Sequence, residues 1–147
     1  MITLIDCTLR DGGYYNNWDF DTTLIAEYLD AMAAADVDFV EIGFRSFDRS
    51  GFKGACAYST DDFIRSLPVA SGQKIGVMVN AAEVVKHPAG VLGATRLLFR
   101  PRSESPVTLV RFACHLRGFE QTLSACAWLK EQGHQVGSNL MQVADRT

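Results

Sequence analysis

The chain has 147 residues, of which 48% are hydrophobic and 21% charged, and this composition is typical of one folded domain and excludes a disordered tail. Its formal net charge of −3 argues against a nucleic-acid partner, because neutralising phosphates needs a basic surface. No run approaches the roughly 20 apolar residues of a membrane span, and the start, MITLIDCTLRDGG, lacks the pattern of a signal peptide. We therefore expect a cytoplasmic protein with no membrane partner, whose four cysteines are reduced.

The first third of the chain predicts two strands separated by a turn and a helix. Residues 2–6 are apolar and β-branched, so we expect a buried strand that ends before a turn at Gly12-Gly13. Residues 24–35 carry apolar side chains at helical spacing. Residues 37–43 predict a second strand, and a polar, glycine-rich segment follows it.

The rest of the chain continues this alternation. A short helix begins at Thr60 and ends before Pro68, and a longer helix is predicted over residues 119–132. Residues 81–95 have a weak helical pattern that proline and glycine interrupt, so their structure stays open. Three further strands are expected at residues 74–79, 108–114 and 135–142.

Alternating strands and helices predict an α/β fold of parallel β/α units. Five strands do not close a (β/α)8 barrel, which needs about 250 residues. The pattern therefore predicts an incomplete barrel of about five strands in sequential order, as a piece of a larger chain. A doubly wound sheet is the alternative, and it would reverse its strand order at a switch point.

Polar residues follow the predicted strands at the sheet edge where parallel α/β proteins bind ligands. Arg10 offers a planar fork of donors for a carboxylate or a developing enolate, and Asp11 offers an oxygen ligand for a hard cation. An ordinary surface ion pair is the alternative for these two. Glu41 lies within an apolar strand and needs a partner, for which an arginine at a neighbouring strand end is suited. The other strand-end candidates, for substrate binding, are Arg45, Asn80 and Asn139.

Other motifs point less clearly to a ligand. Gly12-Gly13 could cradle a phosphate, but the chain has neither GxGxxG nor GxxxxGK[ST], so a turn with positive φ is the simpler interpretation. The three histidines, His87, His115 and His134, lack the HxH or HExxH spacing of metal sites.

The segments LIDCTLRDGG and VDFVEIGFR resemble the metal-dependent TIM-barrel lyase and synthase superfamily, and VGSNLMQVADR at the last predicted strand also fits. Its members include 3-hydroxy-3-methylglutaryl-CoA lyase, 4-hydroxy-2-oxovalerate aldolase, isopropylmalate synthase and pyruvate carboxyltransferase domains. The resemblance covers most of the chain and implies that residues 1–147 are the N-terminal part of a TIM-barrel aldolase- or lyase-like catalytic domain. It implies that Arg10 stabilises an enolate, that Asp11 ligates a divalent metal ion (Mn²⁺ or Mg²⁺), and that Glu41 orients Arg10.

The implied activity is that of an aldolase or lyase, making or breaking a carbon–carbon bond through the enolate of a pyruvate-like 2-oxo acid or an acyl-CoA. The family's other metal ligands form an HxH pair on a later strand, which this sequence lacks, so we expect the 147 residues alone to be inactive. Two alternatives stay open: a non-catalytic partial-barrel interaction module, and a phospholigand-binding α/β domain. Unpaired edge strands, with Val136, Leu140 and Val143 exposed, predict a homo-oligomer.

Overall fold

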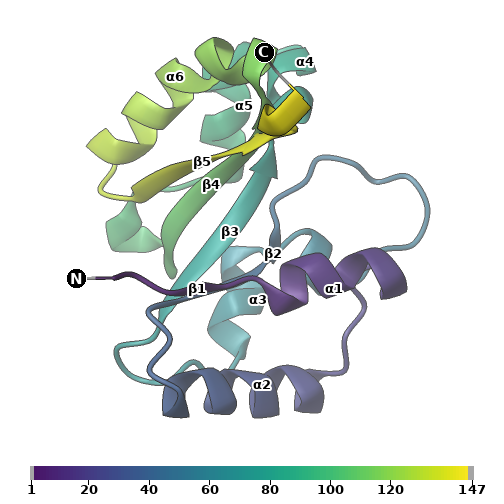
Figure 1. Ribbon diagram of the computed structural model, residues 1–147, viewed down its shortest axis with the longest axis vertical. Helices are drawn as coiled ribbons and strands as arrows, with labels where there is room; N and C mark the ends of the chain where they lie inside the picture. Colours follow the sequence, from purple (N-terminus) through teal and green to yellow (C-terminus); the bar gives the residue numbers. More distant parts are fainter. Residues whose placement is uncertain (1, 146–147) are drawn as a thin grey trace.

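The computed structural model describes residues 2–145 as one curled sheet of five parallel strands with helices between them (Figure 1). The strands pair in the order β1-β2-β3-β4-β5. This sequential order confirms the predicted incomplete barrel, because a doubly wound sheet would have placed β1 between two other strands. The strands are β1 (Ile5–Asp6), β2 (Phe39–Phe44), β3 (Lys74–Asn80), β4 (Val107–His115) and β5 (Gln135–Met141).

Six α-helices of the described residues connect the strands, and the N-terminal caps show why several begin where they do. Asp21 accepts a hydrogen bond from the backbone N–H of Thr23 at 2.8 Å, and Thr60 accepts one from that of Phe63 at 3.2 Å. No helix within residues 2–145 is long and apolar enough to cross a membrane. The helices are α1 (Thr8–Asn16), α2 (Thr22–Ala34), α3 (Asp61–Ser66), α4 (Ala81–Lys86), α5 (Gly90–Leu98) and α6 (Leu116–Glu131).

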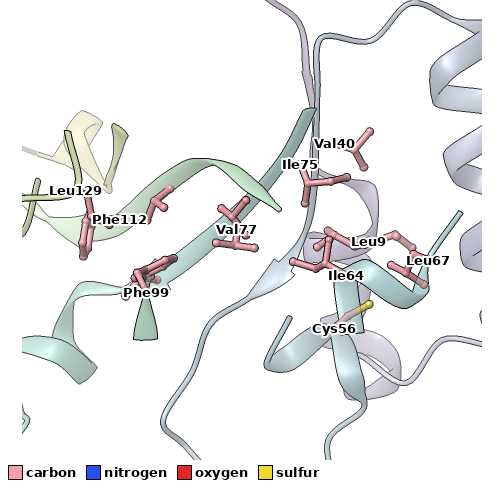
Figure 2. Close-up of a cluster of buried hydrophobic side chains, with 14 of the residues drawn as sticks. Leu9, Val40, Cys56, Ile64, Leu67, Ile75, Val77, Phe99, Phe112 and Leu129 are labelled. Carbon is pink, nitrogen blue, oxygen red and sulfur yellow. The ribbon is translucent and has the colours of Figure 1, made fainter. Parts of the chain in front are cut away.

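The apolar core lies on the face of the sheet that the helices cover. Figure 2 shows Val77 of β3 between two groups of buried side chains, with Phe99 and Phe112 on one side and Leu9 and Ile64 on the other. Side chains alternate along a strand, so the residues between these core positions point to the opposite, concave face. Glu41 lies on that face, since its neighbours on β2 belong to the core.

The first strand is shorter and less buried than predicted. β1 covers two residues, and Ile2 and Leu4 are 91% and 54% exposed, so the prediction of a buried strand over residues 2–6 was wrong for its first half. The reason is that β1 is an edge strand, paired only with β2 in the described sheet. Leu4 still anchors this segment, because its backbone N–H donates to the Asp38 carboxylate at 2.8 Å.

The predicted turn at Gly12-Gly13 was also wrong, because both glycines lie within α1. The chain instead reverses at Asn17 and Trp18, where φ is 59° and 57°. A Cβ atom on Gly13 would lie 1.9 Å from Cδ1 of Trp18, so this glycine makes room for the indole ring rather than for a backbone turn. The glycine pair therefore forms no phosphate-cradling loop.

Replacing these two glycines with alanine should have opposite effects. Gly13→Ala forces the indole of Trp18 to move, and we expect it to lower the free energy of unfolding by about 2 kcal/mol. Gly12→Ala is the matched control, because its Cβ would lie 3.6 Å from Phe20 and a helix favours alanine over glycine by about 0.5–1 kcal/mol. Urea unfolding followed by tryptophan fluorescence measures both. Equal changes in the free energy of unfolding for the two variants would contradict the packing of Trp18 against Gly13.

The structure settles one region that the sequence left open and moves one predicted boundary. The ambiguous region at residues 81–95 forms α4 and most of α5, separated by a short break at residues 87–89. The last helix, α6, begins at Leu116, three residues before the predicted start. Asn80 explains the start of α4, because its side chain accepts a hydrogen bond from the backbone N–H of Ala82 at 3.0 Å.

Candidate functional site

The candidate site is built around Glu41, whose carboxylate is fully buried on the concave face of the sheet. Helix α1 begins directly after β1 and so carries Arg10 to the carboxyl end of the strands. The Nε atom of Arg10 donates to Oε1 of Glu41 at 2.8 Å, and its Nη1 atom donates to the Asp11 carboxylate. The structure therefore brings together the three residues that the sequence analysis placed at the centre of the site.

A second arginine, Arg111 on β4, completes the cluster and was missed by the sequence analysis. Its Nε atom donates to Oε2 of Glu41 at 2.7 Å and its Nη2 atom to Oε1 at 3.0 Å. The Nη2 atom also lies 3.5 Å from Sγ of Cys7. The available signal was an arginine in the middle of the apolar strand segment TLVRFAC, where a charged side chain requires a buried partner.

The charges in this cluster keep both guanidiniums protonated. Burial acts to lower the pKa of Arg10, but the hydrogen bond and the negative charge of Glu41 outweigh it and raise the pKa above its ordinary value. The pKa of Arg111 is raised for the same reason. Burial, and then the charge of Glu41, raise the pKa of the Cys7 thiol, so this sulfur is neutral near pH 7. The Arg10–Glu41–Arg111 cluster carries a net charge of +1, and the exposed Asp11 carboxylate, which pairs with Arg10, offsets that charge.

A group of aromatic side chains fixes the backbone at Arg10. The indole Nε1 of Trp18 donates to the backbone oxygen of Arg10 at 2.9 Å. The ring of Trp18 meets those of Tyr14 and Phe44 edge-on, with centroids 4.9 and 5.5 Å away. An open recess of about 730 Å³ lies beside this helix, and Cys7, Thr8, Asp11, Gly12, Tyr14 and Tyr15 line it.

Asp6, at the end of β1, fixes the backbone from which this site starts. It accepts hydrogen bonds from the Tyr28 hydroxyl and from the backbone N–H of Thr8, the latter at 2.8 Å. Burial acts to raise the pKa of Asp6, but these hydrogen bonds outweigh it and lower the pKa below its ordinary value. The Asp6–Tyr28 contact thus ties α2 to the strand end that precedes Arg10.

Tyr28→Phe should lower the free energy of unfolding by about 1 kcal/mol at pH 7, because it removes one hydrogen bond to a partly exposed carboxylate. A carboxylate whose pKa is lowered by folding stabilises the folded state above its unfolded-state pKa, and that stabilisation is lost as the pH falls through the folded pKa. The difference between wild type and variant should therefore shrink below about pH 4. Urea midpoints at pH 7 and pH 3 test this, and a pH-independent difference would contradict it.

The remaining predicted site residues lie in three different environments. Arg45 is buried and binds the Asp61 carboxylate and two backbone oxygens, those of Ser59 at 3.0 Å and Leu98 at 2.8 Å. Asn80 caps α4. Asn139 lies on β5 and pairs with Ala113 of β4. Ala113 comes two residues after Arg111, so Asn139 lies on the same concave face as Arg111. Within residues 2–145, neither Arg45 nor Asn80 forms a hydrogen bond to the Arg10–Glu41–Arg111 cluster.

The described residues do not build a metal site by themselves. Asp11 offers a carboxylate that is 61% exposed, and Arg10 is its ion-pair partner. Within residues 2–145, no three His, Cys, Asp or Glu side chains lie close enough together to hold a metal ion. A cation at Asp11 would therefore need other ligands.

A crystal structure from Bacteroides vulgatus, described as the N-terminal domain of "a putative aldolase", has a similar fold, with a TM-score of 0.78. The two sequences are 28% identical over 98% of this chain and 46% of that one, so the present chain spans about half its length. No family model and no curated protein matches the sequence. The similarity supports an aldolase-like relative, whereas the narrower lyase and synthase superfamily stays a prediction.

Proposed function

We propose that this chain contributes part of the active site of an aldolase-like enzyme, which makes or breaks a carbon–carbon bond through an enolate. The observation that supports this most strongly is the buried Arg10–Glu41–Arg111 cluster at the carboxyl ends of the strands, where barrel enzymes place their reacting groups. The aldolase-like neighbour supports the same class of reaction.

The cluster suits an anionic oxygen. Forming an enolate moves negative charge onto the carbonyl oxygen, and a donor that is already oriented stabilises that charge most effectively. Glu41 fixes the guanidinium plane of Arg10 and compensates one of the two positive charges. The other positive charge is paired only with the exposed carboxylate of Asp11, which a substrate carboxylate can replace, so we propose a pyruvate-like 2-oxo acid, with an acyl-CoA as the alternative.

We also propose that Asp11 contributes one ligand to a divalent cation, Mn²⁺ or Mg²⁺, when further ligands come from outside residues 2–145. Such a cation would polarise the substrate carbonyl. The roles proposed for Arg10 and Glu41 do not depend on it, because they follow from the hydrogen bond between the two side chains.

Exchange of the methyl protons of pyruvate with deuterium tests enolate formation directly. We expect the intact protein that carries this chain to exchange these protons in D₂O. Proton NMR measures the loss of the methyl signal, with and without added Mn²⁺ or Mg²⁺. Acetyl-CoA in a parallel experiment distinguishes the two substrate classes. Absence of exchange with both substrates, under conditions where the protein is folded, would contradict the proposal.

Association between copies is a second candidate function, and the two sheet edges favour it. Ile2 and Leu4 beside β1, and Leu140 and Val143 near β5, are between 37% and 91% exposed. Val136, which the sequence analysis expected to be exposed, packs against the core instead. We expect sedimentation equilibrium of the 147-residue chain to show a dimer at micromolar concentration, which Leu140→Lys should weaken. A monomer at every concentration would contradict this.

A further inference from the structure

We propose that a second pocket, separate from the Arg10–Glu41–Arg111 cluster, binds a phosphate-bearing small molecule. It is a cavity of about 420 Å³ lined by the segment after β2, by α3, and by the end of α5 with the two residues after it. We name it the arginine pocket, because five arginines line it: Arg45, Arg49, Arg65, Arg96 and Arg100.

The arginine pocket concentrates positive charge in a chain that is acidic overall. Two aspartates, Asp61 and Asp62, also line it, so its net charge is +3, against −3 for the whole chain. A concave surface with one sign of charge focuses the electrostatic field and attracts a ligand of the opposite sign. The charge thus predicts an anionic ligand for this pocket.

The two aspartates do not neutralise the exposed arginines. Asp61 is already held by Arg45 and by the Ser105 hydroxyl, the latter at 2.9 Å. Asp62 lies 3.4 Å from Arg65 and is fully exposed, where an ion pair contributes little. Within residues 2–145, the guanidinium of Arg100 makes no hydrogen bond to another side chain.

Arg45 gives the pocket a fixed, buried wall. Its side chain is 4% exposed and is held by three oxygen acceptors, those of Ser59, Leu98 and Asp61. Burial lowers the pKa of Arg45 below its ordinary value, although the hydrogen bond and the negative charge of Asp61 act to raise it.

The shape and lining of the pocket favour a phosphate ester over a simple inorganic ion. Its volume falls in the range of small-molecule sites, about 300–1,000 Å³, and exceeds what a single phosphate group needs. Guanidinium forks match phosphate oxygens in a bidentate geometry. The Tyr58 ring, on which Arg49 stacks at 3.8 Å, and Leu97, which is 67% exposed, offer apolar contacts to the rest of the molecule.

Calorimetric titration of the chain with inorganic pyrophosphate tests this proposal. Arg49→Ala/Arg100→Ala removes two pocket charges, and we expect it to weaken pyrophosphate binding at least tenfold. Arg117→Ala/Lys130→Ala removes two exposed charges from α6 outside the pocket and should leave binding within twofold. Leu97→Glu adds a carboxylate at an exposed pocket position, so it should abolish binding without disturbing the core.

The outcomes distinguish specific binding in the arginine pocket from nonspecific electrostatic attraction. No binding by the wild type at millimolar pyrophosphate, or an equal loss in the two double variants, would overturn the proposal. Citrate distinguishes phosphate from carboxylate recognition, and binding of citrate as tight as that of pyrophosphate would also overturn it. None of these results bears on the roles of Arg10 and Glu41, which do not line this pocket.

Discussion

Glu41→Gln should cost the protein about 3–5 kcal/mol of its free energy of unfolding, which is the usual effect of removing one partner from a buried ion pair. The Glu41 side chain is fully buried, and the side chains of Arg10 and Arg111 are 11% and 19% exposed. Without the carboxylate, Arg111 loses the one carboxylate that it pairs with among the described residues, and Arg10 keeps only the 61% exposed carboxylate of Asp11. Because their pKa values are raised, both stay protonated, and the loss should be the same from pH 6 to pH 9.

Glu83→Gln is the matched control for this experiment. Glu41 accepts three hydrogen bonds from two arginines, whereas Glu83 accepts two at 2.8 Å from neutral donors, the Ser46 hydroxyl and the Phe47 backbone N–H. We expect this control to lower the free energy of unfolding by only about 1 kcal/mol. Urea unfolding followed by circular dichroism compares the two variants. If Glu41→Gln lowers the free energy of unfolding no more than Glu83→Gln does, the two arginines do not depend on Glu41 for their burial.

The sheet could be predicted from the sequence because its signals are local. Segments such as KIGVMV are short, apolar and β-branched, and the structure has β3 there with only its two end residues exposed. The alternation of such segments with helices was enough to predict parallel pairing in sequential order. The edge strand at residues 2–6 was less predictable, because its burial depends on how many neighbours it has and not on its own residues.

Helix α1 was missed because a long-range contact decides it. Two consecutive glycines disfavour a helix locally, yet Gly12 and Gly13 are helical, since Trp18 packs on the bare backbone of Gly13. The same limit applies to the site. The need of Glu41 for a partner was evident from its strand, but the choice of Arg111, 70 residues away, depends on the placement of β4 two strands from β2.

From the role proposed for Arg10, we expect Arg10→Lys to lower turnover of the intact protein by about 10²–10³-fold, the usual effect of losing one donor to a developing oxyanion. Lysine keeps the positive charge but has no planar fork, so it cannot hold Glu41 and Asp11 and still present a fixed donor to the enolate. Arg117→Lys, on the exposed surface of α6, is the matched control and should leave turnover unchanged. Deuterium exchange of the substrate should fall with turnover, because the donor acts on enolate formation. Asp11→Ala should instead weaken the affinity for Mn²⁺, with activity partly restored at high Mn²⁺. Near-normal exchange in Arg10→Lys would show that this guanidinium does not stabilise the enolate, whatever its contribution to the fold.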